Sequence, residues 1–188
     1  MIEIAFNRDR FWYKQRFIDY TIHRRKYTPR TLETERKVFG YFNEFCLSYI
    51  AYIEMALTFQ HSENNRNQYK DRELAVDVMY SYMKEHTDTH EILLTLKPMI
   101  EEMKGKVINL SEIINFRGTD LDLFRAWDVN NPETLHSLLL YFYRMRCMFF
   151  HGDKFDFVSM IAVLRPTCQC LREINFTLFR AMKEDLNR

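Results

Sequence analysis

The sequence predicts an all-α protein, and three features support this prediction. Gly and Pro number only four each among 188 residues, so the chain has few residues that end helices or form tight turns. Hydrophobic residues make up 47% of the chain and recur mainly at helical spacing. The many aromatic residues and methionines bury large areas, which suits a densely packed helical core. The length fits one domain over residues 1–188.

The net charge of +1 gives no reason to expect general affinity for nucleic acid, but the charge is uneven. Residues 1–30 contain eight Lys or Arg and three acidic residues, so this basic N-terminal arm carries about +5. We expect a helix in the arm that ends before Pro29. Its basic side chains either contact phosphate or form a solvated helix face.

No secretory or membrane segment is evident, because the N-terminus lacks an apolar stretch and no apolar run reaches about 18 residues. The cysteines are therefore expected to be reduced thiols in a cytoplasmic protein. Cys168 and Cys170 lie two positions apart in a helical pattern, which argues against a zinc site. His86 and His90 have a metal-ligand spacing without an evident third ligand, and His136 has no evident partner. No cofactor or metal is expected.

Apolar spacing predicts helices over 31–60, 71–86, 91–103, 132–151 and 155–186, with a polar loop over 61–68. A short helix over 110–116 is also expected within an irregular region. Gly105 is expected to mark a helix end, and Pro166 to kink or divide the last helix. With neither repeats nor an interdomain linker in view, these elements predict a helical bundle with short connections.

The helix expected over 132–151 carries an arginine in an unusual place. At about 100° per residue, Arg146 lies about 20° from Leu135, in the centre of the apolar stripe. Arg144 lies about 200° from Phe142 and is expected to face solvent. A guanidinium on a buried stripe needs either a carboxylate partner or a wet cleft that accepts an anion. The planar guanidinium can donate two parallel hydrogen bonds to the oxygens of a phosphodiester.

His151 follows five residues later, where Gly152 predicts the end of the helix, just as Asn131 and Pro132 predict its start. At a helix end the imidazole is free to turn toward Arg146, and the helix dipole favours its protonated form. A histidine beside a phosphate-binding arginine suits general acid–base chemistry on RNA. The alternative is that His151 only caps the helix and Arg146 forms a structural ion pair.

Residues 143–154, Tyr-Arg-Met-Arg-Cys-Met-Phe-Phe-His-Gly-Asp-Lys, resemble the signature of HEPN domains. That family carries an Arg, four to six residues and then a His, and many small bacterial members read Arg-Cys-Asn-Leu-Phe-His-Gly. Here the Arg, the Cys, the second aromatic residue, the His, the Gly and the Lys match. The resemblance is strong over residues 131–186, and before them only helicity agrees.

This resemblance implies an all-α HEPN-type bundle with extra N-terminal helices, in which residues 131–188 form the motif-bearing helices. It implies a homodimer in which the Arg146 and His151 pairs of both protomers share one cleft and cleave RNA without a metal or cofactor. The Arg would hold the scissile phosphate, and the His would act on the ribose 2′-hydroxyl or the leaving oxygen. The products would be a cyclic phosphate and a 5′-hydroxyl. Such proteins often belong to toxin–antitoxin or anti-phage defence systems, which implies an antitoxin or other defence partner.

Tyr143, Arg144, Asp153 and Lys154 are secondary candidates for substrate contact, although a solvated surface position explains Tyr143, Arg144 and Lys154 more simply. Met148 stands where many relatives carry Asn, and loss of that polar residue would lower or abolish activity. Partner-modified relatives carry a Tyr at the position of Asp153, so control by nucleotide transfer is not expected. The alternative functions are a non-catalytic HEPN module for RNA binding or dimerisation, and an interaction module in a defence operon.

Overall fold

A computed structural model describes the backbone of residues 34–60, 62–63, 66–67, 69–110, 125–151 and 157–187. Side chains are described over 40–60, 69–106, 125–147 and 162–187. Of the described residues, 88% are helical, which confirms the all-α prediction. The basic arm and residues 111–116 of the expected short helix lie outside the described part.

The elements follow the predicted order. They are α2 (Thr34–Ala56), the 3₁₀ turn η2 (Leu57–Phe59), strands β1 (Ser62–Glu63) and β2 (Arg66–Asn67), the π-helix η3 (Glu73–Val78), α3 (Met79–His86), α4 (Thr89–Leu110), α6 (Glu133–His151) and α7 (Phe157–Leu186). The two short strands pair antiparallel within the polar loop. The expected helix end at Gly105 is wrong, because α4 continues to Leu110 and an added Cβ at this glycine would meet no atom within 4 Å.

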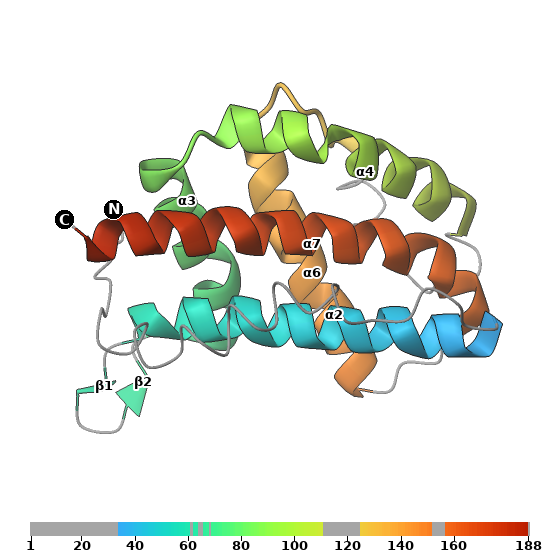
Figure 1. The fold of residues 1–188 in the computed structure, drawn as a ribbon, viewed down its shortest axis with the longest axis horizontal. Helices are drawn as coiled ribbons and strands as arrows, with labels where there is room; N and C mark the ends of the chain where they lie inside the picture. The colour runs from blue at the N-terminus through green and yellow to red at the C-terminus, as the bar shows by residue number, and fades with distance from the viewer. Residues whose placement is uncertain are drawn as a thin grey trace.

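The helices form two layers (Figure 1). α2, α7 and α4 lie alongside one another in the front layer, with α7 in contact with both of the others. α3 and α6 cross behind them, and α6 also contacts η3, which directly precedes α3. The core fills the space between the layers. Its largest fully buried side chains are Tyr52, Tyr82, Phe45, Phe59, Phe142, Met55, Met79, Met83 and Leu93.

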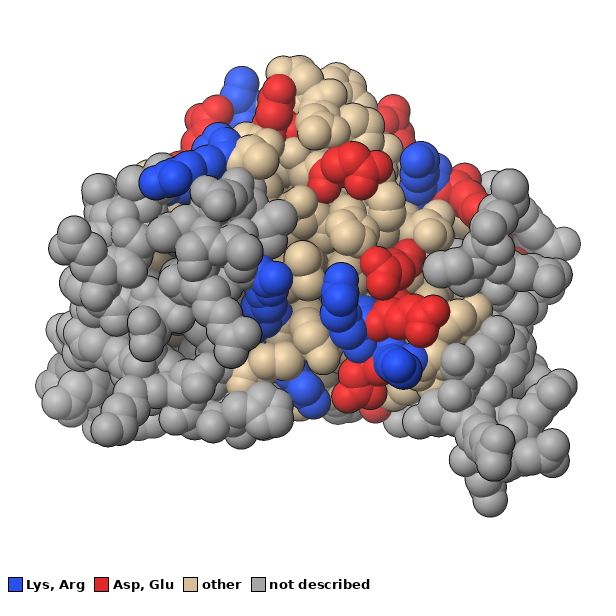
Figure 2. Space-filling view, turned by 180° about the vertical axis from the view of Figure 1, so that it is seen from behind, with Lys and Arg blue, Asp and Glu red and all other residues tan. Residues whose placement is uncertain are grey.

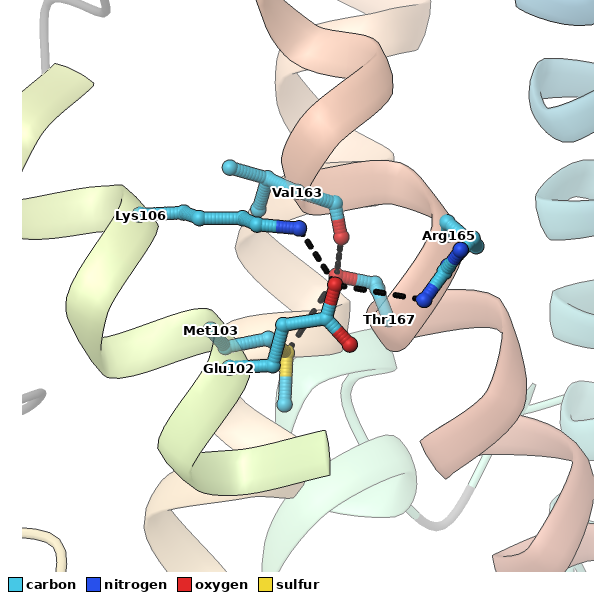
Figure 3. Close-up of polar contacts among 6 residues, drawn as sticks. All are labelled: Glu102, Met103, Lys106, Val163, Arg165 and Thr167. Carbon is cyan, nitrogen blue, oxygen red and sulfur yellow. Dashed lines mark hydrogen bonds and ion pairs between the residues drawn. The ribbon is translucent and has the colours of Figure 1, made fainter. Parts of the chain in front are cut away.

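A buried polar network joins the helices at the point where α7 contains Pro166 (Figure 3). The Thr167 hydroxyl donates to the Val163 carbonyl at 2.7 Å and lies 2.9 Å from the Tyr141 hydroxyl and 3.4 Å from the Met103 sulfur. The network therefore ties α4, α6 and α7 together. α7 continues through Pro166 as one helix, so the proline does not divide it.

An ion-pair cluster beside this network also joins α4 and α7 (Figure 3). Glu102 pairs with Lys106 one turn further along α4, and its carboxylate lies 3.5 Å from the Arg165 guanidinium of α7. The hydrogen bond from Lys106, strengthened by the charges of Lys106 and Arg165, lowers the pKa of Glu102 although burial opposes the shift. The cluster therefore stabilises the contact between α4 and α7 while Glu102 is ionised.

None of the helices in the described ranges combines the length and the apolar character of a membrane span. In the same part of the chain, no group of three or more His, Cys, Asp or Glu side chains is arranged to hold a metal ion. Cys168 and Cys170 are buried in the core, where the Cys168 thiol donates to the Tyr41 carbonyl at 3.3 Å.

Candidate functional site

The first half of α6 is held by polar contacts with η3 and α3. The Asn131 side chain accepts the Glu133 backbone N–H at 3.1 Å and so caps α6, as predicted. The Tyr80 hydroxyl then donates to Glu133 at 2.9 Å. One turn further along, His136 pairs with Asp77 at 2.9 Å and its ring meets the Tyr80 ring edge-on. These contacts fix the axial position and rotation of α6.

α6 runs in the opposite direction to the continuous helical segment formed by η3 and α3. Tyr80 lies at Glu133 and Asp77 lies at His136, so earlier residues of the segment lie toward the end of α6. π-Helical turns are wider than α-helical turns and often occur at functional sites. The Tyr52 hydroxyl from α2 donates to the Ala75 carbonyl within this stretch and so helps to hold the wider turns in place.

Arg146 lies in the second half of α6, where residues from three segments converge on it. Its side chain is half-buried, and its Nη1 atom donates to the Cys147 sulfur at 3.9 Å. Tyr49 on α2 and Asp71, just before the π-helix, interact electrostatically with the Arg146 guanidinium. Tyr143, one turn earlier on α6, hydrogen-bonds the Cys147 side chain. The surroundings of Arg146 are therefore built from phenols, a thiol and one exposed carboxylate.

The charge states at this end of α6 follow from burial. Burial raises the pKa of Tyr49 far above its ordinary value, and the positive charge of Arg146 offsets this only in part. Burial, followed by the charge of Cys147 and its hydrogen bond, also raises the pKa of Tyr143. Burial tends to lower the pKa of Arg146, but the Cys147 hydrogen bond and the electrostatic interactions with Tyr49, Cys147 and Asp71 outweigh it, so the net shift is upward. At neutral pH the cluster holds one permanent cation and two neutral phenols, with the exposed Asp71 carboxylate within electrostatic range of the cation.

This combination is suited to binding an oxyanion. A guanidinium gives parallel hydrogen bonds to two phosphate oxygens, and neutral phenols can donate a hydrogen bond without adding negative charge. Figure 2 shows the face that carries α6. Lys and Arg side chains lie in the middle of this face, with Asp and Glu side chains directly beside them. Among the described residues of this face, any affinity for phosphate is therefore local to a few side chains.

His151, the second residue of the predicted catalytic pair, is the last residue of α6, so the helix ends near the predicted position. It lies five residues, or about 7.5 Å of helix rise, beyond Arg146. The structure describes its backbone but not its side chain, and the same holds for Met148. Asp153 and Lys154 lie outside the described residues. Arg146 and His151 are therefore at the same end of one helix, as predicted.

The prediction that Arg144 faces solvent is wrong. Its side chain is half-buried, as is that of Arg146, and its Nη1 atom has almost no contact with solvent. A helical projection assumes one apolar face, but α6 contacts η3, α2, α3 and α4. Both arginines are therefore held against the protein, and Arg144 is part of the packed structure. Tyr143 is half-buried as well and not a fully solvated surface residue.

Two histidines outside the motif, His86 and His136, have partners that the sequence did not reveal. His136 pairs with Asp77, and His86 lies 3.1 Å from Asp185 near the end of α7. His86 and His90 do not share a helix, because α3 ends at His86 and α4 begins at Thr89. The four-residue metal spacing therefore has no structural basis.

Two neighbours of Arg146, Tyr49 and Asp71, were missed by sequence reasoning. Each is separated from Arg146 by more than 70 positions, and neither lies in a recognisable motif. Asp71 precedes a helical segment, a frequent position for an acid, and Tyr49 lies on the apolar face of α2. Both patterns have ordinary structural explanations, so only the packing shows their relation to Arg146.

Comparison of the chain with protein-family models, with curated proteins and with solved structures finds no match.

Proposed function

We propose that this protein is a metal-independent endoribonuclease of HEPN type, in which Arg146 holds the scissile phosphate and His151 transfers protons. The proposal places the protein in the cytoplasm, as part of a toxin–antitoxin or anti-phage defence system with a partner protein. The match of residues 143–154 to the HEPN signature supports the family, and the surroundings of Arg146 support the chemistry.

The observation that carries the proposal is the half-buried Arg146 guanidinium, which lies within electrostatic range of the phenols of Tyr49 and Tyr143, five residues before the end of α6 at His151. Cleavage of RNA by its own 2′-hydroxyl needs a group that binds the phosphate and a group that moves protons. A half-buried arginine supplies the first without any change of charge state. A histidine at a helix end, which titrates near neutral pH, supplies the second.

A homodimer is part of the proposal, since one Arg and one His give a single pair, whereas a shared cleft would hold two. Two-fold symmetry would bring the same end of α6 from both protomers together. Light scattering is expected to give twice the monomer mass at micromolar concentration, and a monomer at that concentration would contradict this part of the proposal.

The test is incubation of the purified protein with a mixed RNA pool in EDTA. We expect cleavage that persists in the chelator and that Arg146→Lys strongly reduces, because an ammonium cannot make the two parallel hydrogen bonds of a guanidinium. Lys97→Ala is the matched control, since Lys97 is an exposed cation on α4. It is expected to cleave like the parent. Cleavage that EDTA abolishes, or that Arg146→Lys leaves unchanged, would contradict the proposal.

A non-catalytic RNA-binding module is the second candidate, and Met148 is the observation that favours it. A methionine cannot donate the hydrogen bond of the Asn that many HEPN domains carry there. If the parent protein binds RNA without cutting it, Met148→Asn separates the two candidates. Gain of cleavage would show a nuclease site that has lost one polar group, and continued binding without cleavage would favour the module.

A further inference from the structure

A groove lies between the start of α4 and the second half of α7, and the end of α3 closes one side of it. Its volume is about 320 Å³, within the range of small-ligand sites. Ile92 and Leu96 form an apolar floor, and both are buried. Phe176 lines the groove and is 43% exposed, which is unusual for a large aromatic side chain among the described residues.

Carboxylates line this groove at both ends. α4 and α7 run in opposite directions, so the start of α4 lies beside the end of α7 (Figure 1). Asp88, Glu91 and Glu184 therefore belong to one end, and Glu173 to the other. Glu173 and Glu184 are separated by about 16 Å along the helix axis. The groove thus has negative charge at two ends and apolar surface, including Phe176, between them.

Some of these charges already have partners. The Asp88 carboxylate accepts the backbone N–H groups of His90 and Glu91 at 2.9 and 3.1 Å, which caps α4. The Glu173 carboxylate lies 3.4 Å from the guanidinium of the half-buried Arg172. These contacts weaken the attraction for a cation at each end without cancelling it.

The positively charged groups of the lining are Arg180 and, when protonated, His86. The His86 ring stacks on Tyr82, and its Nδ1 atom lies 3.1 Å from Asp185, which also accepts the Tyr82 hydroxyl at 2.6 Å. His86 is thereby held at the rim. The positive charge of Arg180 would repel a positively charged ligand in the groove.

We propose that this groove binds a linear oligoamine, with ammonium groups at the two carboxylate ends and methylene groups along the apolar floor. Carboxylates pair with ammonium groups, and the Phe176 face attracts a cation through its quadrupole. A compact metal ion would use the carboxylates alone and gain nothing from the apolar floor. An anionic ligand would be repelled by the four carboxylates of the lining.

Calorimetric titration with spermidine at low ionic strength tests this proposal in the full chain, because salt screens such contacts. We expect saturable binding. Glu91→Gln and Glu184→Gln should each weaken it about two- to fivefold, as expected for partly exposed pairs. Phe176→Ala should weaken it about two- to fivefold through loss of the cation–π contact. Glu101→Gln is the matched control, since Glu101 is an exposed acid on α4 outside the groove, and it should leave binding unchanged.

Arg180→Gln gives the sharpest result, because removal of a like charge should strengthen spermidine binding by about two- to fivefold. A damaged fold cannot imitate this gain. The proposal is overturned if spermidine shows no saturable binding, if Arg180→Gln weakens it, or if Glu101→Gln weakens it as much as Glu91→Gln. Displacement of spermidine by Mg²⁺ at matched charge concentration would also overturn it, because the groove would then act only as a diffuse negative surface.

Discussion

The two ends of α6 differ in what their polar side chains do. At the start, the Asn131 cap, the contact of Glu133 with Tyr80 and the pair of His136 with Asp77 all fix the helix in place. At the other end, the groups that interact with Arg146 are two phenols, a thiol and the exposed carboxylate of Asp71. The same helix thus carries polar groups that serve the fold and polar groups suited to an anion. Residue type alone does not distinguish them.

His151→Ala should produce the largest effect at the second end. If the proposed function holds, loss of the general acid–base group should lower RNA cleavage about 10²- to 10⁴-fold. The fold should survive, since the interaction of a histidine with the helix dipole typically contributes only about 0.3–1 kcal/mol. Cleavage rates and thermal melts of parent and variant check both parts. Parent-like cleavage by His151→Ala would mean that the histidine only caps α6.

His136→Ala should show the reverse behaviour at the first end. Removal of the hydrogen bond to Asp77 is expected to lower the free energy of unfolding by about 0.5–1.5 kcal/mol. RNA cleavage per folded molecule should not change. Urea denaturation followed by circular dichroism measures the stability. A large loss of cleavage by the folded variant would contradict the assignment of His136 to the stability of the fold alone.

Tyr80→Phe should have a smaller effect that depends on pH. Burial, followed by the hydrogen bond to Glu133 and its charge, raises the pKa of Tyr80 to about 12. The neutral phenol is therefore favoured in the folded state. Its contribution is fully present below the pKa of about 10 of an unfolded tyrosine, and it is lost as the pH rises toward 12. The stability difference between parent and Tyr80→Phe should thus be constant from pH 7 to 9 and shrink above pH 10. A difference that grows in that range would contradict this assignment.

Glu102→Gln should have the smallest effect, because its partners Lys106 and Arg165 are substantially exposed. The expected loss is about 0.2–1 kcal/mol at neutral pH. Since the pKa of Glu102 is lowered in the folded state, this contribution is present above the unfolded pKa and is lost as the pH falls through the folded value. Acid denaturation curves of parent and variant should therefore converge at low pH. Curves that diverge there would contradict a stabilising role for ionised Glu102.

The sequence predicted the helices well because their apolar spacing is regular, and it predicted the start of α6 because Asn131 and Glu133 follow the rules of helix capping. Gly105 was misleading, since glycine is tolerated inside a helix at a modest cost and nothing at this position requires the chain to stop. The π-helical turns over 73–78 have no simple sequence pattern. They depend on packing, including the Tyr52 hydroxyl from another helix.

The candidate site was predictable only in its local part. Arg146 and His151 stand close together in a recognisable motif, and the structure places both at the same end of α6. The burial of Arg144 depends on elements that cover α6 from several sides, which a projection of one helix does not include. Tyr49 and Asp71 approach Arg146 from distant parts of the chain. Their contribution required the packing of the whole bundle.

The chemical ends of the RNA products test the central claim most directly. Cleavage in EDTA by the parent protein should leave a cyclic phosphate on one fragment and a 5′-hydroxyl on the other, because the ribose 2′-hydroxyl is the nucleophile. Arg146→Lys and His151→Ala should lose these products together. Fragments with a 5′-phosphate would show that water attacked the phosphate, and would contradict the roles assigned to Arg146 and His151.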